Sequence, residues 1–245
     1  MPSLIDSARG LPLVSDLLSR CTFPLPSTAV DCAVSGGADS VALLVLACAA
    51  NLNVTAWHVD HGLRENSHTE AALVAQLATQ LGTQFESRTV NVVQGANTEA
   101  RAREARYATL PTGVMTGHTA DDQAETILIN LLRGSGTRGL AGMQPTTQRP
   151  LLHIRRSETQ TLCNALGIAV FHDPSNNDER FQRNRIRHEV LPLMESLAKR
   201  DLVPVLTRQA DLLRDDDDLL NELAGALDPT DTLALASAPI AMARR

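Results

Sequence analysis

The sequence predicts an α/β fold: a parallel sheet whose strands alternate with helices, followed by a small helical segment. Two observations predict it. Short apolar runs alternate with longer helical patterns as far as residue 133, and three of the four short runs end in glycine or polar residues. Strands separated by helices of this length require crossover connections, which are right-handed and give a parallel sheet with helices on both faces.

The expected elements follow this alternation. The expected strands are 28–34, 53–59, 85–90 and 113–118. The helices expected after them are 39–50, about 67–81, 98–110 and about 120–133. The elements expected from residue 134 onward are a glycine-rich loop, a helix near 156–166, a short strand at 168–172 and helical structure over 183–225. This last region is expected to break at Pro192 and Pro204, because proline interrupts helical hydrogen bonding.

The pattern divides the chain into three parts. We expect an N-terminal helical extension at 1–27, the α/β domain at 28–195 and a short, acidic helical segment at 196–245. The final stretch, LALASAPIAMARR, stops without a clear helix end, which is consistent with a natural chain that continues beyond Arg245.

The composition indicates a soluble, cytoplasmic protein with no membrane partner. Hydrophobic residues make up 43% of the 245-residue chain, which is enough for one sizeable core. No apolar run approaches the roughly 20 residues that cross a bilayer, and the N-terminus lacks the pattern of a signal peptide. The four cysteines are far apart and form no CxxC motif, which argues against a disulfide scaffold or a zinc site.

Charge is distributed unevenly along the chain. Residues 201–245 hold nine acidic and four basic residues, a net of −5, which leaves −1 of the total −6 for residues 1–200. Basic groups cluster in RAREAR (101–106) and RNRIRH (183–188), and nearly all of them are arginine. Arginine binds phosphate in a bidentate manner, so these clusters allow a nucleic-acid partner despite the acidic total. Solvated helix faces are the alternative interpretation.

The stretch AVSGGADSVALL, residues 33–44, predicts an anion site. A strand leads into Gly36 and Gly37, which can adopt positive φ and let backbone N–H groups approach a ligand. The helix that follows adds unpaired N–H donors and a partial positive charge. The stretch has neither the GKS or GKT of a Walker motif nor GxGxxG. A plain tight turn between strand and helix is the alternative.

SGGADS, residues 35–40, matches the SGGxDS signature of the PP-loop, or N-type, ATP pyrophosphatases. This resemblance implies an adenine nucleotide α-hydrolase-like fold that binds ATP and cleaves it to AMP and pyrophosphate. It also associates Asp39 with Mg2+. The positions that it assigns to ATP binding in the loop are Ser35, Gly36, Gly37, Ala38, Asp39 and Ser40.

Five further motifs narrow the resemblance to one family, the tRNA(Ile)-lysidine synthetases, over about residues 29–195. The motifs are HVDHGLR (58–64), ARYATL (105–110), GHTADDQAETILINLLRGSGTRGLAGM (117–143), RPLL (149–152) and DPSNND..F.RNRIRH (173–188). The resemblance implies that ATP adenylates the carbonyl oxygen at position 2 of the wobble cytosine in isoleucine tRNA with a CAU anticodon. Free L-lysine then displaces AMP and gives lysidine.

Asp122 and Glu125 are the candidates for binding the lysine ammonium. They are three residues apart and therefore lie on one face of the expected helix, where one of them can also serve as the base. His118, at the preceding strand end, is a candidate for steering phosphate or transferring a proton. The alternative is a capping box between Thr119 and Asp122, and Asp121 is expected to be a cap only.

The remaining site assignments concern phosphate and tRNA. Arg103 and Arg106 are candidates for neutralising charge at the α-phosphate together with Mg2+, with helix-surface charges as the alternative. By resemblance, His58 borders the adenosine pocket. Arg64, at the end of the second strand, is a candidate for contact with the tRNA substrate. Arg133 and Arg138 are candidates on a flexible loop that closes over the target base, and Arg183 and Arg187 are candidates for a backbone clamp.

Two other functions are left open. One is another PP-loop pyrophosphatase, such as an ammonia-using synthetase, and the other is a non-catalytic ATP-binding module. The module would need the 35–40 loop but neither the carboxylate pair nor the arginine clusters. A tRNA thiolase would need catalytic or cluster cysteines, which the cysteine spacing does not offer. The oligomeric state is open as well, and a homodimer is one state that the sequence allows.

Overall fold

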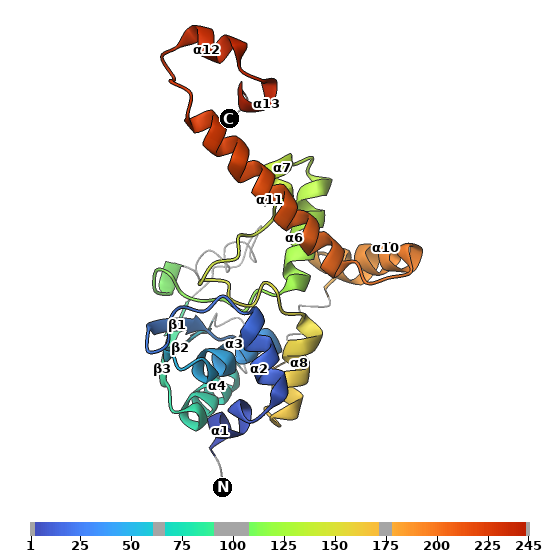
Figure 1. Ribbon diagram of the computed structural model, residues 1–245. Helices are drawn as coiled ribbons and strands as arrows, with labels where there is room; N and C mark the ends of the chain where they lie inside the picture. Colours follow the sequence, from blue (N-terminus) through green and yellow to red (C-terminus); the bar gives the residue numbers. More distant parts are fainter. Residues whose placement is uncertain (1–2, 61–66, 91–107, 172–177, 244–245) are drawn as a thin grey trace. The chain divides into compact units, whose positions relative to one another are not determined.

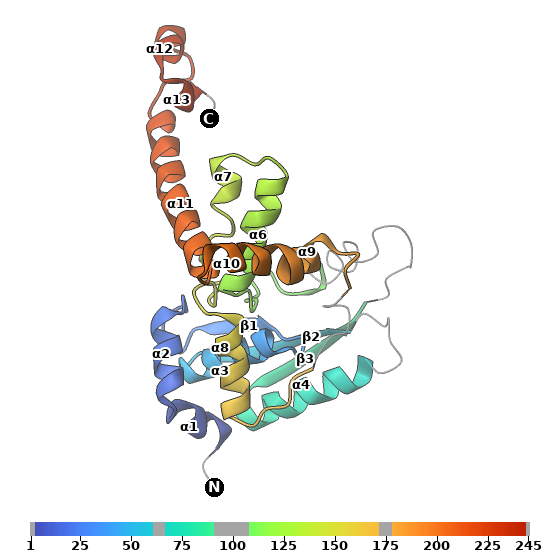
Figure 2. The ribbon, with the colours of Figure 1, turned by 90° about the vertical axis from the view of Figure 1, so that its right-hand side faces the viewer.

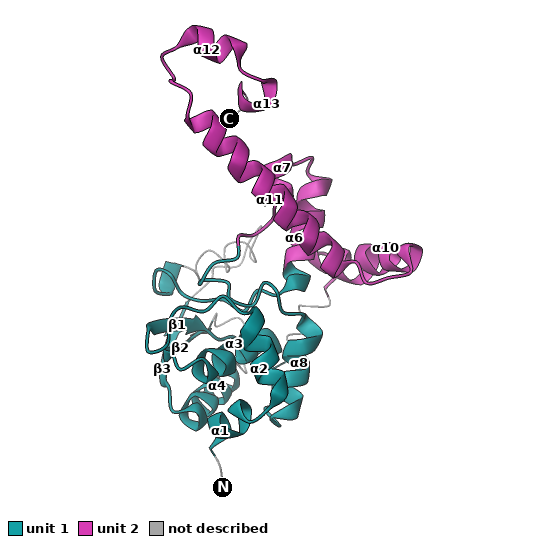
Figure 3. Cartoon of the chain, in the orientation of Figure 1, with its two compact units in different colours: residues 1–122, 145–176 teal, residues 123–144, 177–245 magenta. Residues whose placement is uncertain are grey.

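The computed structural model describes residues 3–60, 67–90, 108–171 and 178–243 (Figure 1). The chain forms two compact units, residues 1–122 with 145–176 and residues 123–144 with 177–245 (Figure 3). These are called unit 1 and unit 2 below. The division does not follow the sequence-based boundaries at 27/28 and 195/196, because the N-terminal helices belong to unit 1 and unit 2 takes residues from the middle of the chain.

Unit 1 contains a parallel sheet of three strands in the order β1 (Ala29–Ala33), β2 (Asn53–Asp60) and β3 (Gln84–Thr89). Cys32 lies opposite Ala56, which in turn lies opposite Phe85. Burial alternates along β2, where Val54, Ala56 and His58 are buried and their neighbours are not. The strands, their order of appearance and their parallel direction confirm the predicted fold class.

Helices α3 (Ala38–Ala49) and α4 (Ser67–Leu81) lie on the same side of this sheet (Figure 2). Ten of the twelve α3 residues are buried, which explains why the run from Val41 onward is apolar on every face. A helix of this kind can only sit in a core, so its N-terminus is held firmly beside the strand ends.

The N-terminal segment packs into the same core rather than forming a separate extension. Ala8 of α1 (Leu4–Arg9) and Val14 and Leu17 of α2 (Pro12–Arg20) are almost fully buried in one cluster with α3. Leu162 and Cys163 of α8 (Arg156–Ala165) complete this cluster. The two N-terminal helices therefore brace the helix that follows the SGGADS loop.

The strand predicted at 113–118 is wrong as a strand. Only one bridge forms, between Met115 and Cys32, through Met115 N–H to the Asp31 carbonyl (2.8 Å) and Ala33 N–H to the Met115 carbonyl (2.9 Å). The next residue, Thr116, donates its N–H to the carbonyl of Gln148 instead. The segment therefore touches the edge of β1 at one point and turns away toward residue 148.

The strand predicted at 168–172 is also wrong within the described residues, because 168–171 adopt no regular structure. Phe171 donates its N–H to the Gly36 carbonyl (2.8 Å) and so contacts the glycine loop rather than a strand. The helix predicted at 98–110 lies mostly outside the described residues.

Unit 2 is helical. Helix α6 (Ala120–Leu132) begins in unit 1 and continues into unit 2 from Gln123. The further helices of unit 2 are α7 (Thr137–Leu140), α9 (Gln182–Arg185), α10 (Leu191–Ala198), α11 (Val203–Gly225), α12 (Thr232–Ser237) and α13 (Ile240–Ala243).

The expected break at Pro192 does not occur. A π-helical turn, Ile186–Val190, joins α9 to α10, and Pro192 falls in the first turn of α10. A π-turn changes the hydrogen-bond pattern just before the proline, so the ring is accommodated without a break. The real break follows at Lys199, which is left-handed (φ 55°), and Pro204 then sits in the first turn of α11.

The second half of the glycine-rich loop that follows α6 is held by hydrogen bonds from side chains of α6 and α11. The Gln123 side chain bonds both the N–H (2.7 Å) and the carbonyl (2.9 Å) of Met143. Arg214 of α11 donates to the carbonyls of Ala141 (2.6 Å) and Met143 (3.0 Å). Asn130 holds the Gly139 carbonyl (2.7 Å).

None of the helices that the structure describes has the length and apolar character to cross a membrane.

Replacing Leu44 by alanine tests the role of α3 as the buried support. Leu44 is fully buried, and Leu→Ala changes in cores cost about 2–5 kcal/mol because a cavity remains. Chemical denaturation should show a loss of this size. Leu25→Ala, at a position 81% exposed in the same unit, should change the free energy of unfolding little. Equal effects of the two variants would contradict the packing described here.

Candidate active site

The SGGADS segment forms a loop that is built to receive an anion. Gly36 has φ 87°, a conformation that favours glycine. Gly37 is the N-cap of α3 and no side chain caps this helix, so the first N–H groups of α3 can serve a ligand. Ser40 Oγ accepts from Ser35 N–H (3.1 Å) and donates to the Gly37 carbonyl (2.8 Å), which fixes the curvature of the loop.

The loop rests on β2. Val34 N–H bonds the Trp57 carbonyl (2.8 Å), and His58 Nδ1 lies 2.9 Å from the Val34 carbonyl. A carbonyl only accepts, so Nδ1 carries the proton. His58 is 2% exposed. It was predicted from resemblance to border the adenosine pocket, and in the structure it supports the strand that leads into the loop.

Asp39, in the first turn of α3, is held on both carboxylate oxygens by residues of α8. Thr159 Oγ1 donates to Oδ1 (2.5 Å), and Arg156 Nε lies 3.3 Å from Oδ2. Burial raises the pKa of Asp39 above its ordinary value. The hydrogen bond from Thr159 and the charge of Arg156 offset this partly, whereas the nearby Asp122 carboxylate adds to it. The ionised form of Asp39 is therefore costly to the fold.

Asp122, in the first turn of α6, has two kinds of contact at once. Its Oδ2 accepts from Thr119 N–H (2.9 Å) and Thr119 Oγ1 (3.0 Å), which is the capping arrangement that the sequence left open. Its Oδ1 lies 2.9 Å from Arg156 Nη2. Asp121 instead pairs with Arg155 (3.1 Å) and accepts from the Arg156 N–H (2.8 Å). Capping thus orients Asp122 without using both of its oxygens.

Sequence reasoning missed Arg156 and Thr159. Both sit at the start of α8, three residues apart and so on one helix face. The paired arginines in HIRRSE were the only visible signal, and nothing in the sequence linked them to residue 39, which is more than one hundred residues away. Their role depends on the packing of α8 against α3.

In the sequence, His118 lies between Met115, which forms the bridge to β1, and Asp122. Its Nδ1 is 2.7 Å from Thr116 Oγ1, which also lies 3.2 Å from the Gln148 carbonyl. The imidazole is thereby fixed at the N-terminal end of α6, in the same unit as the loop and Asp122.

Glu125 belongs to unit 2, where it is almost fully buried and doubly neutralised. Its side chain is 1% exposed, Arg183 Nε lies 2.8 Å from Oε2, and Arg187 Nε lies 2.6 Å from Oε1. Arg183 also donates to Thr126 Oγ1 (3.0 Å). The two arginines predicted as a tRNA clamp therefore have an internal carboxylate partner. Removing them would leave a buried charge without a counter-ion, which is strongly destabilising.

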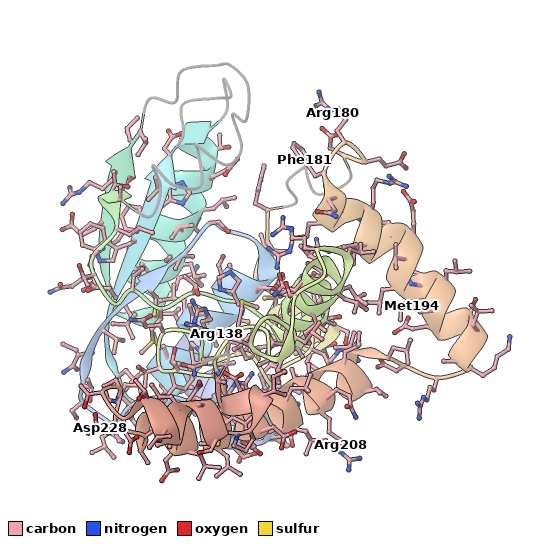
Figure 4. The ribbon with its side chains drawn as sticks, turned by 90° about the horizontal axis from the view of Figure 1, so that it is seen from above. Arg138, Arg180, Phe181, Met194, Arg208 and Asp228 are labelled. Atoms are coloured by element: carbon pink, nitrogen blue, oxygen red, sulfur yellow. The ribbon has the colours of Figure 1, made fainter. Side chains whose placement is uncertain are left out.

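Two predicted tRNA-contacting arginines are exposed on unit 2. Arg133 follows α6 and Arg138 lies on α7 (Figure 4), and both side chains reach solvent. Arg180, which sequence reasoning did not single out, projects from the segment before α9 (Figure 4) with its side chain 85% exposed and paired with Asp178. Arg64, Arg103 and Arg106 lie outside the described residues.

The donor set suits a magnesium ion that arrives with a phosphate ligand. Among the described residues no group of three or more His, Cys, Asp and Glu side chains could hold a metal ion. Mg2+ is commonly bound through one or two carboxylates together with substrate phosphates. Asp39 fits this pattern, because its carboxylate lies in the first turn of α3, beside the N–H groups that can receive phosphate.

Comparison with known proteins gives a consistent result. The PP-loop domain family matches residues 14–194. A tRNA(Ile)-lysidine synthase of Rhodococcus erythropolis is 43% identical over 236 residues, which cover 90% of this chain and 73% of the relative. That of Nocardia farcinica is 42% identical and covers 91% of this chain and 75% of the relative.

A solved structure supports the fold. The U34-tRNA thiolase NcsA of Methanococcus maripaludis superposes with a TM-score of 0.65 at 17% identity, covering 86% of this chain and 80% of the thiolase. At this identity the similarity concerns the fold alone, and it agrees with the PP-loop match.

Asp39→Asn should raise stability while weakening nucleotide binding. The pKa of Asp39 is raised in the fold, so the folded state favours the neutral form, which asparagine imitates. At neutral pH the variant should have a higher Tm than the wild type. The difference should shrink as the pH falls through the Asp39 pKa, since protonation then removes the same cost.

Calorimetric titration with Mg–ATP should show weaker binding by the Asp39→Asn variant. Ser157→Ala, at an exposed position on α8, is the control and should change neither quantity. A lower Tm with unchanged Mg–ATP affinity in Asp39→Asn would mean that Asp39 is a structural ion-pair partner of Arg156.

Proposed function

The chain belongs to the tRNA(Ile)-lysidine synthase family of PP-loop proteins, and from this premise we propose how its residues carry out the reaction. It is a ligase-type enzyme that joins lysine to the wobble cytidine of isoleucine tRNA with a CAU anticodon and releases AMP and pyrophosphate. The observation that carries the assignment of roles is the ion-pair network in unit 1. It joins the phosphate-loop carboxylate Asp39 to Asp122 through one guanidinium.

In the first step the cytosine O2 attacks the α-phosphate, and the bond to the β-phosphate breaks. The N–H groups from Gly36 to Asp39 at the start of α3 and the hydroxyl of Ser35 hold the departing pyrophosphate. Ser40 serves ATP binding by fixing the loop, because its hydroxyl donates to the Gly37 carbonyl. Mg2+ at Asp39 would neutralise phosphate charge. Arg103 and Arg106 are assigned to the α-phosphate from the sequence, and His118 is assigned to steering phosphate or moving a proton.

In the second step the ε-amine of lysine attacks C2, and the C2–O bond breaks to release AMP. Lysine is an ammonium at neutral pH, and removing its proton at pH 7 costs roughly 4–5 kcal/mol. Asp122 is assigned to bind the ammonium and to accept this proton. Glu125 is the second assigned carboxylate. An ammonium can reach it only in exchange for Arg183 or Arg187, because both now neutralise it.

The tRNA contacts are assigned to arginines. Arg133 and Arg138 are exposed near the glycine-rich loop, and Arg64 follows from the sequence. Arg183 and Arg187 can contribute only as far as their pairing with Glu125 allows. We assign the reaction to the cytoplasm, in keeping with four cysteines that form no disulfide.

Thiol chemistry has no support in this chain. Burial raises the pKa of Cys21, Cys48 and Cys163 to about 12 and raises that of Cys32 further. Protonated, buried thiols are poor nucleophiles and poor metal ligands. An ammonia-using synthetase would share the phosphate loop but would not require Asp122 to bind an amine side chain, so the acceptor distinguishes the two reactions.

The proposal predicts which tRNA accepts lysine. Purified protein with ATP, Mg2+ and radiolabelled lysine should label unmodified isoleucine tRNA that carries a CAU anticodon. Methionine tRNA with the same anticodon should stay unlabelled. Asp122→Asn should lower kcat/KM for lysine by two or more orders of magnitude, as expected when a catalytic acid–base group is lost.

Asp121→Asn is the matched control, because Asp121 is one residue away and pairs with Arg155. The asparagine keeps an oxygen that can accept the Arg156 N–H, as Asp121 does. It should lower Tm while the KM for lysine stays near the wild-type value. Full activity of Asp122→Asn would remove the lysine assignment. Ammonia replacing lysine as the acceptor would remove the proposed reaction.

Arg138→Ala should weaken tRNA binding without loss of stability. Its side chain is exposed, and a lost phosphate contact lowers affinity for all tRNAs and reduces the salt dependence by about one charge. Filter binding at several salt concentrations measures both. An unchanged salt slope would exclude Arg138 from the tRNA contact. Glu195, exposed in part on α10, bonds Leu202 N–H, so its substitution should affect Tm and not the slope.

A further inference from the structure

We propose that Arg156 makes lysine binding depend on bound nucleotide: its guanidinium pairs with Asp122, and the phosphates of ATP draw it away from this carboxylate. This inference rests on the proposed function, because it takes Asp122 as the lysine-binding carboxylate. It adds a positioning residue and an order of binding, nucleotide before lysine. All of the groups that it uses lie in unit 1.

The geometry makes Arg156 the shared partner of two sites. Its Nε lies 3.3 Å from Asp39 Oδ2, and its Nη2 lies 2.9 Å from Asp122 Oδ1. The three side chains are 28%, 25% and 13% exposed, so water screens these pairs less than it screens surface pairs. One guanidinium therefore serves a carboxylate of the phosphate loop and a carboxylate of α6 at the same time.

The second oxygen of each carboxylate is fixed without Arg156. Thr159 holds Oδ1 of Asp39, and Thr119 holds Oδ2 of Asp122 by its N–H and its hydroxyl. Both carboxylates consequently keep their orientation when the guanidinium moves. The oxygen that faces Arg156 then changes partner, which is the change that an incoming ammonium requires at Asp122.

The backbone of Arg156 is anchored on α8, and its side chain reaches both Asp39 and Asp122. Its N–H donates to Asp121 Oδ2 (2.8 Å), and the residue is the first of α8. The arginine fork prefers phosphate or carboxylate in a bidentate geometry. Phosphates bound at the loop beside Asp39 would therefore compete with Asp122 for the same guanidinium, and release of Asp122 would follow from binding of the nucleotide.

The energetic consequence is a reciprocal coupling between the two ligands. Without nucleotide, lysine must displace Arg156 from Asp122, so its affinity is low. With nucleotide, the guanidinium has phosphate oxygens as alternative partners, and lysine affinity rises. By linkage, lysine must tighten nucleotide binding by the same factor. Lysine would therefore bind tightly only after ATP has bound.

The test is calorimetric titration of lysine into the intact protein with and without the non-cleavable analogue Mg–α,β-methylene-ATP. In the wild type the analogue should raise lysine affinity by about fivefold or more, within the usual range of coupling. Without the analogue, lysine should bind the Arg156→Ala variant at least as tightly as it binds the wild type. The analogue should change the affinity of this variant for lysine little. Arg156→Lys should show an intermediate coupling.

Two variants separate this mechanism from general damage. Thr159→Val removes a hydroxyl that bonds Asp39 Oδ1 and the backbone carbonyl of Arg156 but leaves both ion pairs of the Arg156 guanidinium in place, so it should weaken binding of the analogue and preserve the coupling factor. Ser157→Ala should behave as wild type. Wild-type lysine affinity that is unaffected by the analogue, or lysine binding that is undetectable in both conditions, would overturn the inference. So would an Arg156→Ala protein that binds lysine more weakly yet keeps the full coupling.

The same wild-type preparation is assayed for incorporation of labelled lysine into isoleucine tRNA. Incorporation without coupling defeats the role of Arg156 and leaves the proposed function intact. Absence of incorporation with an active Mg–ATP site defeats the proposed function, and the inference falls with it.

Discussion

The arrangement of unit 1 depends on offsetting the cost of burying the Asp39 carboxylate beside the phosphate loop. Burial and the nearby Asp122 carboxylate raise the pKa of Asp39, and a hydroxyl and a guanidinium oppose this shift. Both come from α8, which packs against the buried helix α3. A fold optimised for stability alone would avoid this acid, and its retention is understandable where a cation and phosphates are to be bound.

The buried helix α3 supports the site, and the SGGADS loop at its start contacts the ligand. The apolar run of α3 belongs to the core on all sides, so the core holds its N-terminus, and Gly36 and Gly37 give the backbone the close approach that an anion needs. The acidic residues are placed on the first turns of α3 and α6, where helix N-termini favour negative charge. Stability and ligand binding therefore use the same helix ends, and Thr119 capping Asp122 is part of the site's construction.

Hydrophobic periodicity and local turn chemistry sufficed to predict β1 to β3, α3, α4, α6 and α8, because each of these elements carries its signal within a short window. The strand expected around Met115 does not form, since the bond from Thr116 to Gln148 that ends the pairing joins residues 32 apart. Asp39 and Asp122 could be singled out from their motifs. Arg156, which joins them, could not, and neither could the burial of Glu125 between Arg183 and Arg187. Such contacts arise from packing between distant segments, and a single sequence carries no local trace of them.

The central claim is that two carboxylates serve two successive steps, Asp39 in adenylation and Asp122 in the attack by lysine. The most direct measurement is transfer of label from [α-32P]ATP to isoleucine tRNA in the absence of lysine, followed by addition of lysine. The account predicts that label becomes attached to the tRNA, survives in Asp122→Asn and is released as AMP by lysine only in the wild type. Label that never appears on the tRNA, or that is released by lysine equally well in Asp122→Asn, would contradict it.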